Sequence, residues 1–261
     1  MLLEHETMTF GYDEAGSGKA LLLLHGFPYQ REFWRPQLGA LPARTVAVDL
    51  PGFGESSALL GDADLESYVA ALRLFCQGLG LGKVALAGHS FGGYIALAWA
   101  LRHPKEVEGV CLVASRATAD SREAAGNRLS MAHQLQDGAP LEPFVEPMPA
   151  RMLCRNRNTT EGQRLVRSLM EPLRREGIVA AQRAMARRPD VSGQLPSLGM
   201  PALVLAGEQD QLIPLEESGI VAAALPAGRL VVPPGTGHFV SREAVKESNA
   251  ALSDWLGRIG A

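Results

Sequence analysis

Short runs of consecutive apolar residues alternate along the chain with longer stretches in which apolar positions recur every three or four residues. The short runs are nearly unbroken in apolar character, which is typical of strands buried on both faces of a sheet. Strands of this kind are predicted at residues 20–24, 45–48, 84–87, 107–114, 202–206 and 230–232. Their alternation with helices predicts an α/β fold with a mostly parallel central sheet covered by helices on both faces.

The longer stretches predict amphipathic helices. Between residues 65 and 79 the apolar side chains follow the i, i+3, i+4 spacing of a helix with one buried face. Helices are predicted at residues 65–79, 92–102, 215–225 and 242–258. The first dozen residues alternate weakly between apolar and polar, and they predict an antiparallel hairpin at the edge of the sheet.

One long stretch, residues 116–195, contains no predicted strand; it is helix-like, rich in Arg and Met, and interrupted by several prolines. Connections within compact domains are normally much shorter. This stretch is therefore predicted to be a helical cap inserted between two core strands. The predicted domains are a first part of the core at 1–115, the cap at 116–195 and a second part of the core at 196–261.

The composition mainly limits the number of domains and the classes of partner. The chain has 261 residues, 46% of them hydrophobic and 20% charged, with a formal net charge of −3. This length fits one large α/β domain, with or without an insertion. The acidic balance gives no reason to expect a nucleic-acid partner, and acids break up the local arginine density into solvated helix faces.

Targeting and metal signals are also missing from the pattern. The apolar runs are far shorter than the roughly 20 residues of a membrane span. Acids stand near the N-terminus where a signal peptide would carry Lys or Arg. The simplest expectation is a cytoplasmic protein that binds no membrane. The cysteines at 76, 111 and 154 have unrelated spacings, so neither a metal site nor a redox motif is expected.

The run from Val84 to Gly93 carries the first chemical signal. It places a predicted strand directly before Gly88-His89-Ser90-Phe91-Gly92 and a predicted helix directly after it. This arrangement is typical of a nucleophile elbow, a tight strand-to-helix turn that exposes a serine. The two small glycines leave room for the turn, and the helix directs its free N–H groups toward the site. Ser90 is therefore the candidate nucleophile.

A serine nucleophile needs a base that removes its proton. His238 ends a Pro-Pro-Gly-Thr-Gly-His loop that leaves the carboxyl end of the last predicted strand, where open α/β sheets place their reactive groups. His89 is adjacent to Ser90 but is expected to point elsewhere. His103 is expected to cap a helix or lie on the surface, and His25 to brace a loop.

The base in turn needs a carboxylate that fixes its tautomer. Asp210 follows the predicted strand at 202–206 and lies at the same sheet edge. The chain order Ser90, Asp210, His238 is the order in which the fold with this elbow carries its nucleophile, acid and base. Glu208 and Asp120 are weaker alternatives for the acid.

The oxyanion of a tetrahedral intermediate needs two backbone N–H donors, worth about 3 kcal/mol each where one has been removed by mutation. Phe91, directly after the nucleophile, supplies one of them. The second is expected from Phe27, in the His25-Gly26-Phe27-Pro28 turn that follows the first buried strand. Pro28 stiffens this turn and has no N–H to donate.

Residues 20–115 and 200–258 resemble the α/β-hydrolase superfamily. The matching segments are His25-Gly26-Phe27-Pro28, Asp49-Leu50-Pro51-Gly52-Phe53-Gly54-Glu55-Ser56, Gly88-His89-Ser90-Phe91-Gly92-Gly93, Gly207-Glu208-Gln209-Asp210 and Gly235-Thr236-Gly237-His238. The resemblance implies that the inserted helices form a cap over the site. It also implies structural roles for Asp49 and Ser56.

Within the superfamily, a serine nucleophile argues against the haloalkane dehalogenases and epoxide hydrolases, which use Asp. The Gly26-Phe27-Pro28 turn departs from the glycine-rich loop of proline iminopeptidases and carbon–carbon bond hydrolases. Long-chain lipases would show a larger apolar lid. The small esterases remain, with carboxylesterase, perhydrolase-type and enol-lactonase-like members, and the cap looks most similar to the 3-oxoadipate enol-lactonase-like group.

The resemblance implies a carboxylic ester hydrolase that works through an acyl-enzyme and needs no metal or organic cofactor. The alternatives are an enol-lactonase-type lactone hydrolase, a perhydrolase and a slow-turnover ligand-sensing protein. The partner is a small-molecule ester or lactone. An arginine such as Arg128 or Arg151 could pair with a substrate carboxylate. Methionines are candidates for a pliable apolar lining, although core packing is the commoner role; they are Met131, Met148, Met152, Met170 and Met185.

Overall fold

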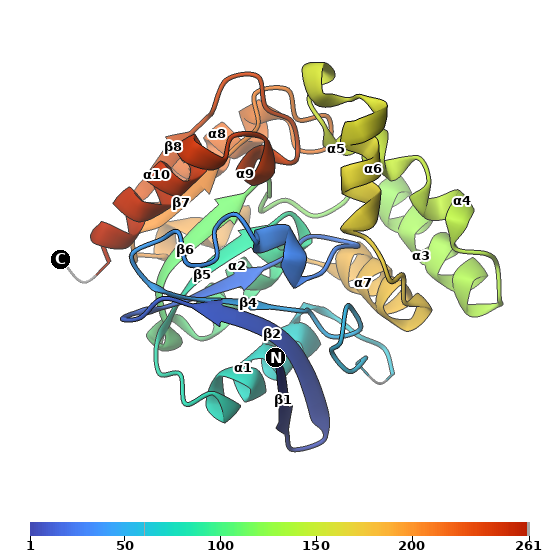
Figure 1. The fold of residues 1–261 in the computed structure, drawn as a ribbon, viewed down its shortest axis with the longest axis horizontal. Helices are drawn as coiled ribbons and strands as arrows, with labels where there is room; N and C mark the ends of the chain where they lie inside the picture. The colour runs from blue at the N-terminus through green and yellow to red at the C-terminus, as the bar shows by residue number, and fades with distance from the viewer. Residues whose placement is uncertain (60, 260–261) are drawn as a thin grey trace.

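The computed structural model describes residues 1–59 and 61–259 of the chain. Its centre is an eight-stranded sheet in the order β1-β2-β4-β3-β5-β6-β7-β8 (Figure 1). The strands are β1 (Leu2–His5), β2 (Met8–Ala15), β3 (Ala20–Leu24), β4 (Arg44–Val48), β5 (Val84–His89), β6 (Val107–Val113), β7 (Ala202–Leu205) and β8 (Gly228–Val231). All neighbouring pairs from β4 to β8 are parallel, while β1 and β2 form the predicted antiparallel hairpin at one edge.

The central strands explain the unbroken apolar runs. Every residue of β3 and β5 is buried, because helices cover both faces of the sheet. The prediction of burial on both faces is wrong for β8, where Leu230 is 37% exposed. Among the described strands, β8 pairs with β7 alone and forms the second edge of the sheet, so part of its surface faces water.

The core helices follow the predicted positions closely. They are α1 (Leu65–Gly78), α2 (Phe91–Arg102), α8 (Leu215–Ala224), α9 (Val240–Glu243) and α10 (Val245–Gly257), with short 3-10 turns at Arg31–Trp34 and Pro104–Glu106. Asp64 begins α1 by accepting a hydrogen bond from the backbone N–H of Ser67, and the Ser67 hydroxyl returns to the Asp64 backbone in a capping box.

The predicted single helix at 242–258 is two helices in the structure. The backbone leaves the helical region at Ala244, with φ −128° and ψ 66°. The short helix α9 is held by other parts of the chain, because the Glu243 carboxylate accepts hydrogen bonds from the backbone N–H groups of Cys154 and Gly237. The contact with Cys154 spans 89 positions, and no local sequence signal encodes it.

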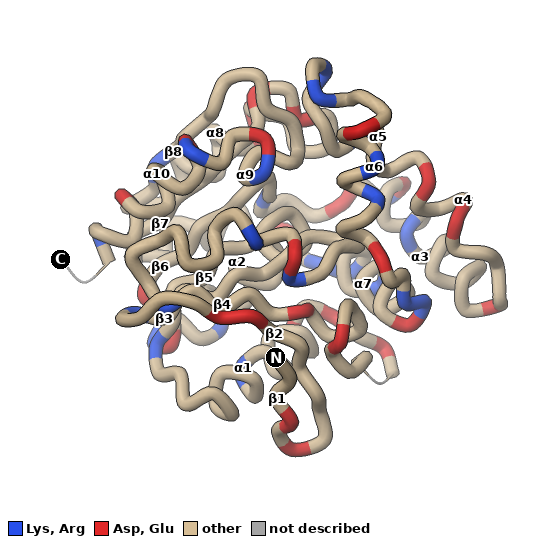
Figure 2. Tube along the Cα trace, in the orientation of Figure 1, with Lys and Arg blue, Asp and Glu red and all other residues tan. Residues whose placement is uncertain are grey.

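The stretch between β6 and β7 contains only helices and turns. These are α3 (Arg122–Gln136), α4 (Glu142–Val145), α5 (Met148–Met152), α6 (Thr160–Ser168) and α7 (Arg175–Arg187), with 3-10 turns at Arg155–Arg157 and Ser192–Ser197. Figure 1 shows them gathered beside the sheet, in green to gold, and α3 packs along α7. Basic and acidic residues are interspersed along the whole trace, this arginine-rich stretch included (Figure 2). Within the described ranges, no helix combines the length and the apolar character needed to cross a membrane.

Candidate active site

Ser90 occupies a strained turn between β5 and α2. Its backbone lies at φ 49° and ψ −110°, a region that residues other than glycine rarely adopt. The Ser90 N–H donates to the Val113 carbonyl at 2.9 Å, and the Ser90 carbonyl accepts from the Ser115 hydroxyl at 2.9 Å. Hydrogen bonds to the end of β6 and to the segment after it therefore hold the turn and leave the partly exposed side chain free.

Two glycines make this turn possible. A Cβ on Gly88 would overlap the backbone of Gly92, and a Cβ on Gly92 would overlap the carbonyl oxygen of Leu24. Because Gly88 has no side chain, α2 can start directly after β5. The second contact brings the turn that follows β3 against the start of α2. The Gly-x-Ser-x-Gly pattern thus follows from the close approach of three backbone segments.

The candidate base and acid meet at the carboxyl ends of β7 and β8. The Nδ1 of His238 lies 2.8 Å from Oδ2 of Asp210, and both side chains are almost completely buried. The other carboxylate oxygen of Asp210 accepts the backbone N–H groups of Leu212 at 2.8 Å and Ile213 at 3.0 Å. Because Nδ1 faces a carboxylate, the neutral ring carries its proton there and keeps Nε2 as the lone-pair nitrogen. In this state His238 can accept a proton.

Ser90, Phe27 and His238 line one cavity of about 510 Å³, a size that suits a small organic molecule. The structure therefore brings these sequence-predicted residues together, with Asp210 behind the histidine ring. Phe91 is fully buried and begins α2, so its backbone N–H belongs to the first turn of that helix. Four of the five singled-out methionines also line the cavity: Met131, Met148, Met152 and Met185. Met170 does not; it is buried in the core cluster instead.

The turn that carries Phe27 is braced by His25. Nε2 of His25 accepts the backbone N–H of Leu50 at 2.9 Å, and Nδ1 donates to the Gly26 carbonyl at 2.9 Å. Complete burial lowers the pKa of His25 to about 4, so the ring stays neutral and keeps both roles near neutral pH. The loop after β4 is fixed in the same way, because Asp49 accepts the backbone N–H groups of Arg31 and Glu55. These contacts agree with the bracing and structural roles predicted for His25 and Asp49.

The two alternative acids are engaged elsewhere. Glu208 accepts the backbone N–H of Gly235 at 2.8 Å and so supports the loop that leads to His238. The Asp120 carboxylate oxygens accept hydrogen bonds from guanidinium nitrogens of Arg116 at 3.0 Å, Arg128 at 2.6 Å and Arg188 at 2.8 Å. Burial opposes ionisation of Asp120, but the hydrogen bond from Arg188 and the charge of Arg128 outweigh it and hold the pKa of the carboxyl below its ordinary value.

The charged part of the cavity wall is mostly basic. Arg116, Arg128 and Arg151 line it together with a single carboxylate, Asp120. Arg128 also donates to the Gln182 side chain at 3.0 Å, which leaves it held in place from two sides. Of these arginines, the sequence pattern singled out Arg128 and Arg151 and missed Arg116. Arg116 lies just after the carboxyl end of β6, at the sheet edge where the reactive groups gather. This position could have identified Arg116 from the sequence.

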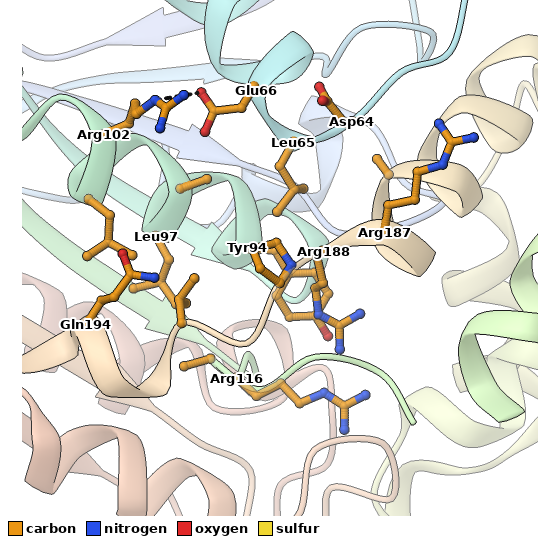
Figure 3. Close-up of a pocket in the computed structure, with 16 residues that line it drawn as sticks. Asp64, Leu65, Glu66, Tyr94, Leu97, Arg102, Arg116, Arg187, Arg188 and Gln194 are labelled. Atoms are coloured by element: carbon orange, nitrogen blue, oxygen red, sulfur yellow. Dashed lines mark ion pairs between the residues drawn. The ribbon is translucent and has the colours of Figure 1, made fainter. Parts of the chain in front are cut away.

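Figure 3 shows a second cavity, of about 310 Å³. Tyr94 and Arg116 line both this cavity and the first one. The Arg188 guanidinium lies 4.2 Å from the centre of the Tyr94 ring, an arrangement that favours a cation–π contact. Tyr94 follows Ser90 by four residues, so it lies one turn further along α2 on the same face. This spacing could have identified Tyr94 from the sequence.

Comparisons with known proteins point to one group. The family model described as the alpha/beta hydrolase fold matches residues 19–244. The chain is 29% identical to the (E)-2-((N-methylformamido)methylene)succinate hydrolase of Acinetobacter baylyi, over 95% of this chain and 94% of that protein. It is 32% identical to the pimeloyl-[acyl-carrier protein] methyl ester esterase of Edwardsiella ictaluri, over 87% of this chain and 90% of that protein.

Solved structures agree on the architecture. A thermophilic esterase from Thermogutta terrifontis, solved with malate bound, superimposes with a TM-score of 0.92 at 34% identity, covering 100% of this chain and 99% of that one. The enol-lactonase from Burkholderia xenovorans has a TM-score of 0.88, covering 98% of this chain and 100% of that one. At 20% identity, the latter likeness concerns the fold alone.

Proposed function

Because the chain belongs to the α/β-hydrolase family, we propose that it is a serine hydrolase that cleaves carboxylic ester bonds of small substrates through an acyl-enzyme. The observation that carries the proposal is the pairing of His238 with Asp210 at 2.8 Å, beside a cavity that Ser90 and His238 both line. A serine, a base and an orienting carboxylate at the ends of three different strands form the arrangement that acyl transfer needs.

The proposed reaction proceeds in two halves. Ser90 Oγ attacks the ester carbonyl while Nε2 of His238 takes its proton, and the oxyanion rests against the N–H groups of Phe27 and Phe91. The protonated histidine then gives this proton to the departing alcohol, which leaves an ester between Ser90 and the acyl group. A water molecule, deprotonated by His238, attacks that ester and releases the acid and free Ser90.

The helices between Arg122 and Arg187 supply most of the residues that line the cavity with Ser90. We propose that residues 116–195 act as a cap that selects the substrate, between core parts at 1–115 and 196–261. A cyclic ester would open by the same steps, with the alcohol still attached to the acyl group. Lactone hydrolysis is therefore the alternative substrate reaction. A perhydrolase would instead use peroxide in place of water at the acyl-enzyme.

Steady-state hydrolysis of short p-nitrophenyl esters tests the proposal. We expect continuous turnover, with a rapid first release of about one p-nitrophenol per active site if hydrolysis of the acyl-enzyme is the slower half. A single release followed by a stall would favour a slow-turnover ligand-sensing protein and contradict the esterase proposal. Formation of peracid from acetate and hydrogen peroxide would identify a perhydrolase.

The charges of the cavity favour an ester that also carries a carboxylate. The arginines of the cavity wall outnumber Asp120, the carboxylate among them, and Arg128 is held in place by Asp120 and Gln182. A guanidinium that is already positioned loses little conformational freedom when it binds an anion. Two similar proteins, the (E)-2-((N-methylformamido)methylene)succinate hydrolase and the esterase solved with malate bound, carry dicarboxylates in their names as well.

A matched pair of esters measures this preference. At low ionic strength we expect kcat/KM for the monomethyl ester of hexanedioic acid to exceed that of methyl hexanoate by about tenfold, and the ratio to fall as salt is added. Arg128→Gln should lower the ratio, whereas Arg187→Gln, which lines the neighbouring cavity, should leave it unchanged. Equal rates for the two esters at low salt would refute an anion preference and leave the esterase proposal standing.

A further inference from the structure

The residue before the candidate nucleophile has no part in the reaction described above. His89 ends β5, and its side chain is completely buried. Its ring is stacked on Phe33, with 4.3 Å between the ring centres and 25° between the planes. The ring centre of Phe239 lies 6.1 Å from that of His89, with 89° between the planes. An aromatic cage therefore holds the imidazole in a single orientation.

One ring nitrogen of His89 contacts the candidate base through its backbone. Nε2 of His89 lies 2.9 Å from the carbonyl oxygen of His238. A carbonyl oxygen can only accept, so Nε2 carries the proton and donates it. The two imidazole rings are 4.8 Å apart at 59°. His89 thus fixes the main chain of His238, while Asp210 fixes its side chain.

The other ring nitrogen faces the turn that carries Phe27. A Cβ on Gly26 would overlap Nδ1 of His89, so the backbone of this turn packs directly against the ring. In the described part of the chain, Nδ1 is buried and has no hydrogen-bond partner. A buried acceptor without a partner costs about 1–3 kcal/mol.

The charge state of His89 suits such a role. Burial lowers its pKa well below the ordinary value, and the neighbouring His238 and His25 lower it further, although the hydrogen bond to the His238 carbonyl opposes this. The ring is therefore neutral whenever His238 takes up a proton. No second positive charge then competes with the protonated base at this short distance.

We propose that His89 is a positioning residue that holds the backbone of the base His238 and the oxyanion turn at Gly26 in register with the adjacent nucleophile, Ser90. The inference rests on the proposed function, since the roles of His238 as base and of the Gly26 turn in binding the oxyanion are themselves proposed. Among the smaller aromatic side chains, only imidazole combines a ring that stacks on Phe33 with a ring N–H donor. Phenylalanine keeps the ring without the donor, and glutamine keeps a donor without the ring.

The test compares His89→Phe with His89→Gln, each normalised to the number of active sites that react with a fluorophosphonate. For His89→Phe we expect kcat to fall about 10- to 100-fold with KM within about twofold of the wild type, because misalignment by about 1 Å affects the transition state most. We expect His89→Gln to recover part of the loss. If His89→Phe does not fold, His89→Leu serves as the donor-free partner of His89→Gln, since the two side chains are close in volume.

A second readout does not depend on turnover. The proton between His238 Nδ1 and Asp210 should give a downfield signal in the proton NMR spectrum of the wild type, and loss of the His89 donor should shift or broaden it. The proposal is overturned if His89→Phe keeps the wild-type kcat per titrated site and an unchanged signal. A wild type without ester turnover, whose downfield signal still responds to His89→Phe, would refute the proposed function and preserve the positioning role.

Discussion

Replacing Ser90 with alanine is expected to lower kcat for ester hydrolysis by a factor of about 10⁴ or more, because the variant has no atom that can form the acyl-enzyme. The fold should survive. Backbone groups make the hydrogen bonds that hold the Ser90 turn: the Ser90 N–H donates to the Val113 carbonyl, and the Ser90 carbonyl accepts from the Ser115 hydroxyl. Alanine retains both. The measurement is kcat on a short p-nitrophenyl ester together with the thermal unfolding midpoint.

Ser130→Ala is the matched control, because Ser130 is exposed on α3 and far along the chain from the elbow. We expect this variant to keep the wild-type kcat. A Ser90→Ala protein that is folded and hydrolyses the ester at a rate within tenfold of the wild type would show that another group is the nucleophile.

Replacing His238 with alanine is expected to lower kcat by a factor of about 10⁴ or more as well. The variant has no base to remove the serine proton and no acid for the leaving alcohol. It should also be less stable than the wild type, because Oδ2 of the buried Asp210 carboxylate loses its partner at 2.8 Å. Added imidazole can enter a cavity of about 510 Å³ and should restore part of the rate.

His133→Ala is the control for general effects of losing a histidine, since the His133 side chain is 76% exposed on α3. It should change neither kcat nor the response to imidazole. If His238→Ala kept near-normal activity without imidazole, another residue would have to be the base.

Much of the sheet follows from local sequence. The unbroken apolar run at Ala20–Leu24 predicted a strand with the bounds that the structure has, because a strand between two parallel neighbours has no polar face to encode. The elbow could be predicted for a similar reason: close backbone contacts exclude a side chain at Gly88 and Gly92. Asp210 and His238 were predicted as acid and base from their places after strands, since the carboxyl ends of parallel strands share one edge.

The remaining features depend on contacts between distant residues. Next to the break between α9 and α10 at Ala244, the Glu243 carboxylate accepts the backbone N–H of Cys154, 89 positions away, and no local pattern predicts this contact. Arg116 lines the cavity because the segment that follows β6 forms part of the cavity wall. The contact of His89 with the backbone of His238 spans 149 positions. The spacing of apolar residues predicts the helix or strand that carries a residue, but it does not predict which distant residue that side chain contacts.

The central claim is that Ser90 carries the covalent intermediate, and active-site labelling tests it most directly. The protein is treated with a fluorophosphonate, digested and examined by peptide mass spectrometry, in parallel with Ser90→Ala. The account predicts one phosphonyl group on the wild-type protein, located on Ser90, with loss of ester hydrolysis in proportion to labelling and no label on the alanine variant. A wild-type protein that hydrolyses esters while the label lies on another residue, or while complete labelling of Ser90 leaves the rate unchanged, would contradict it.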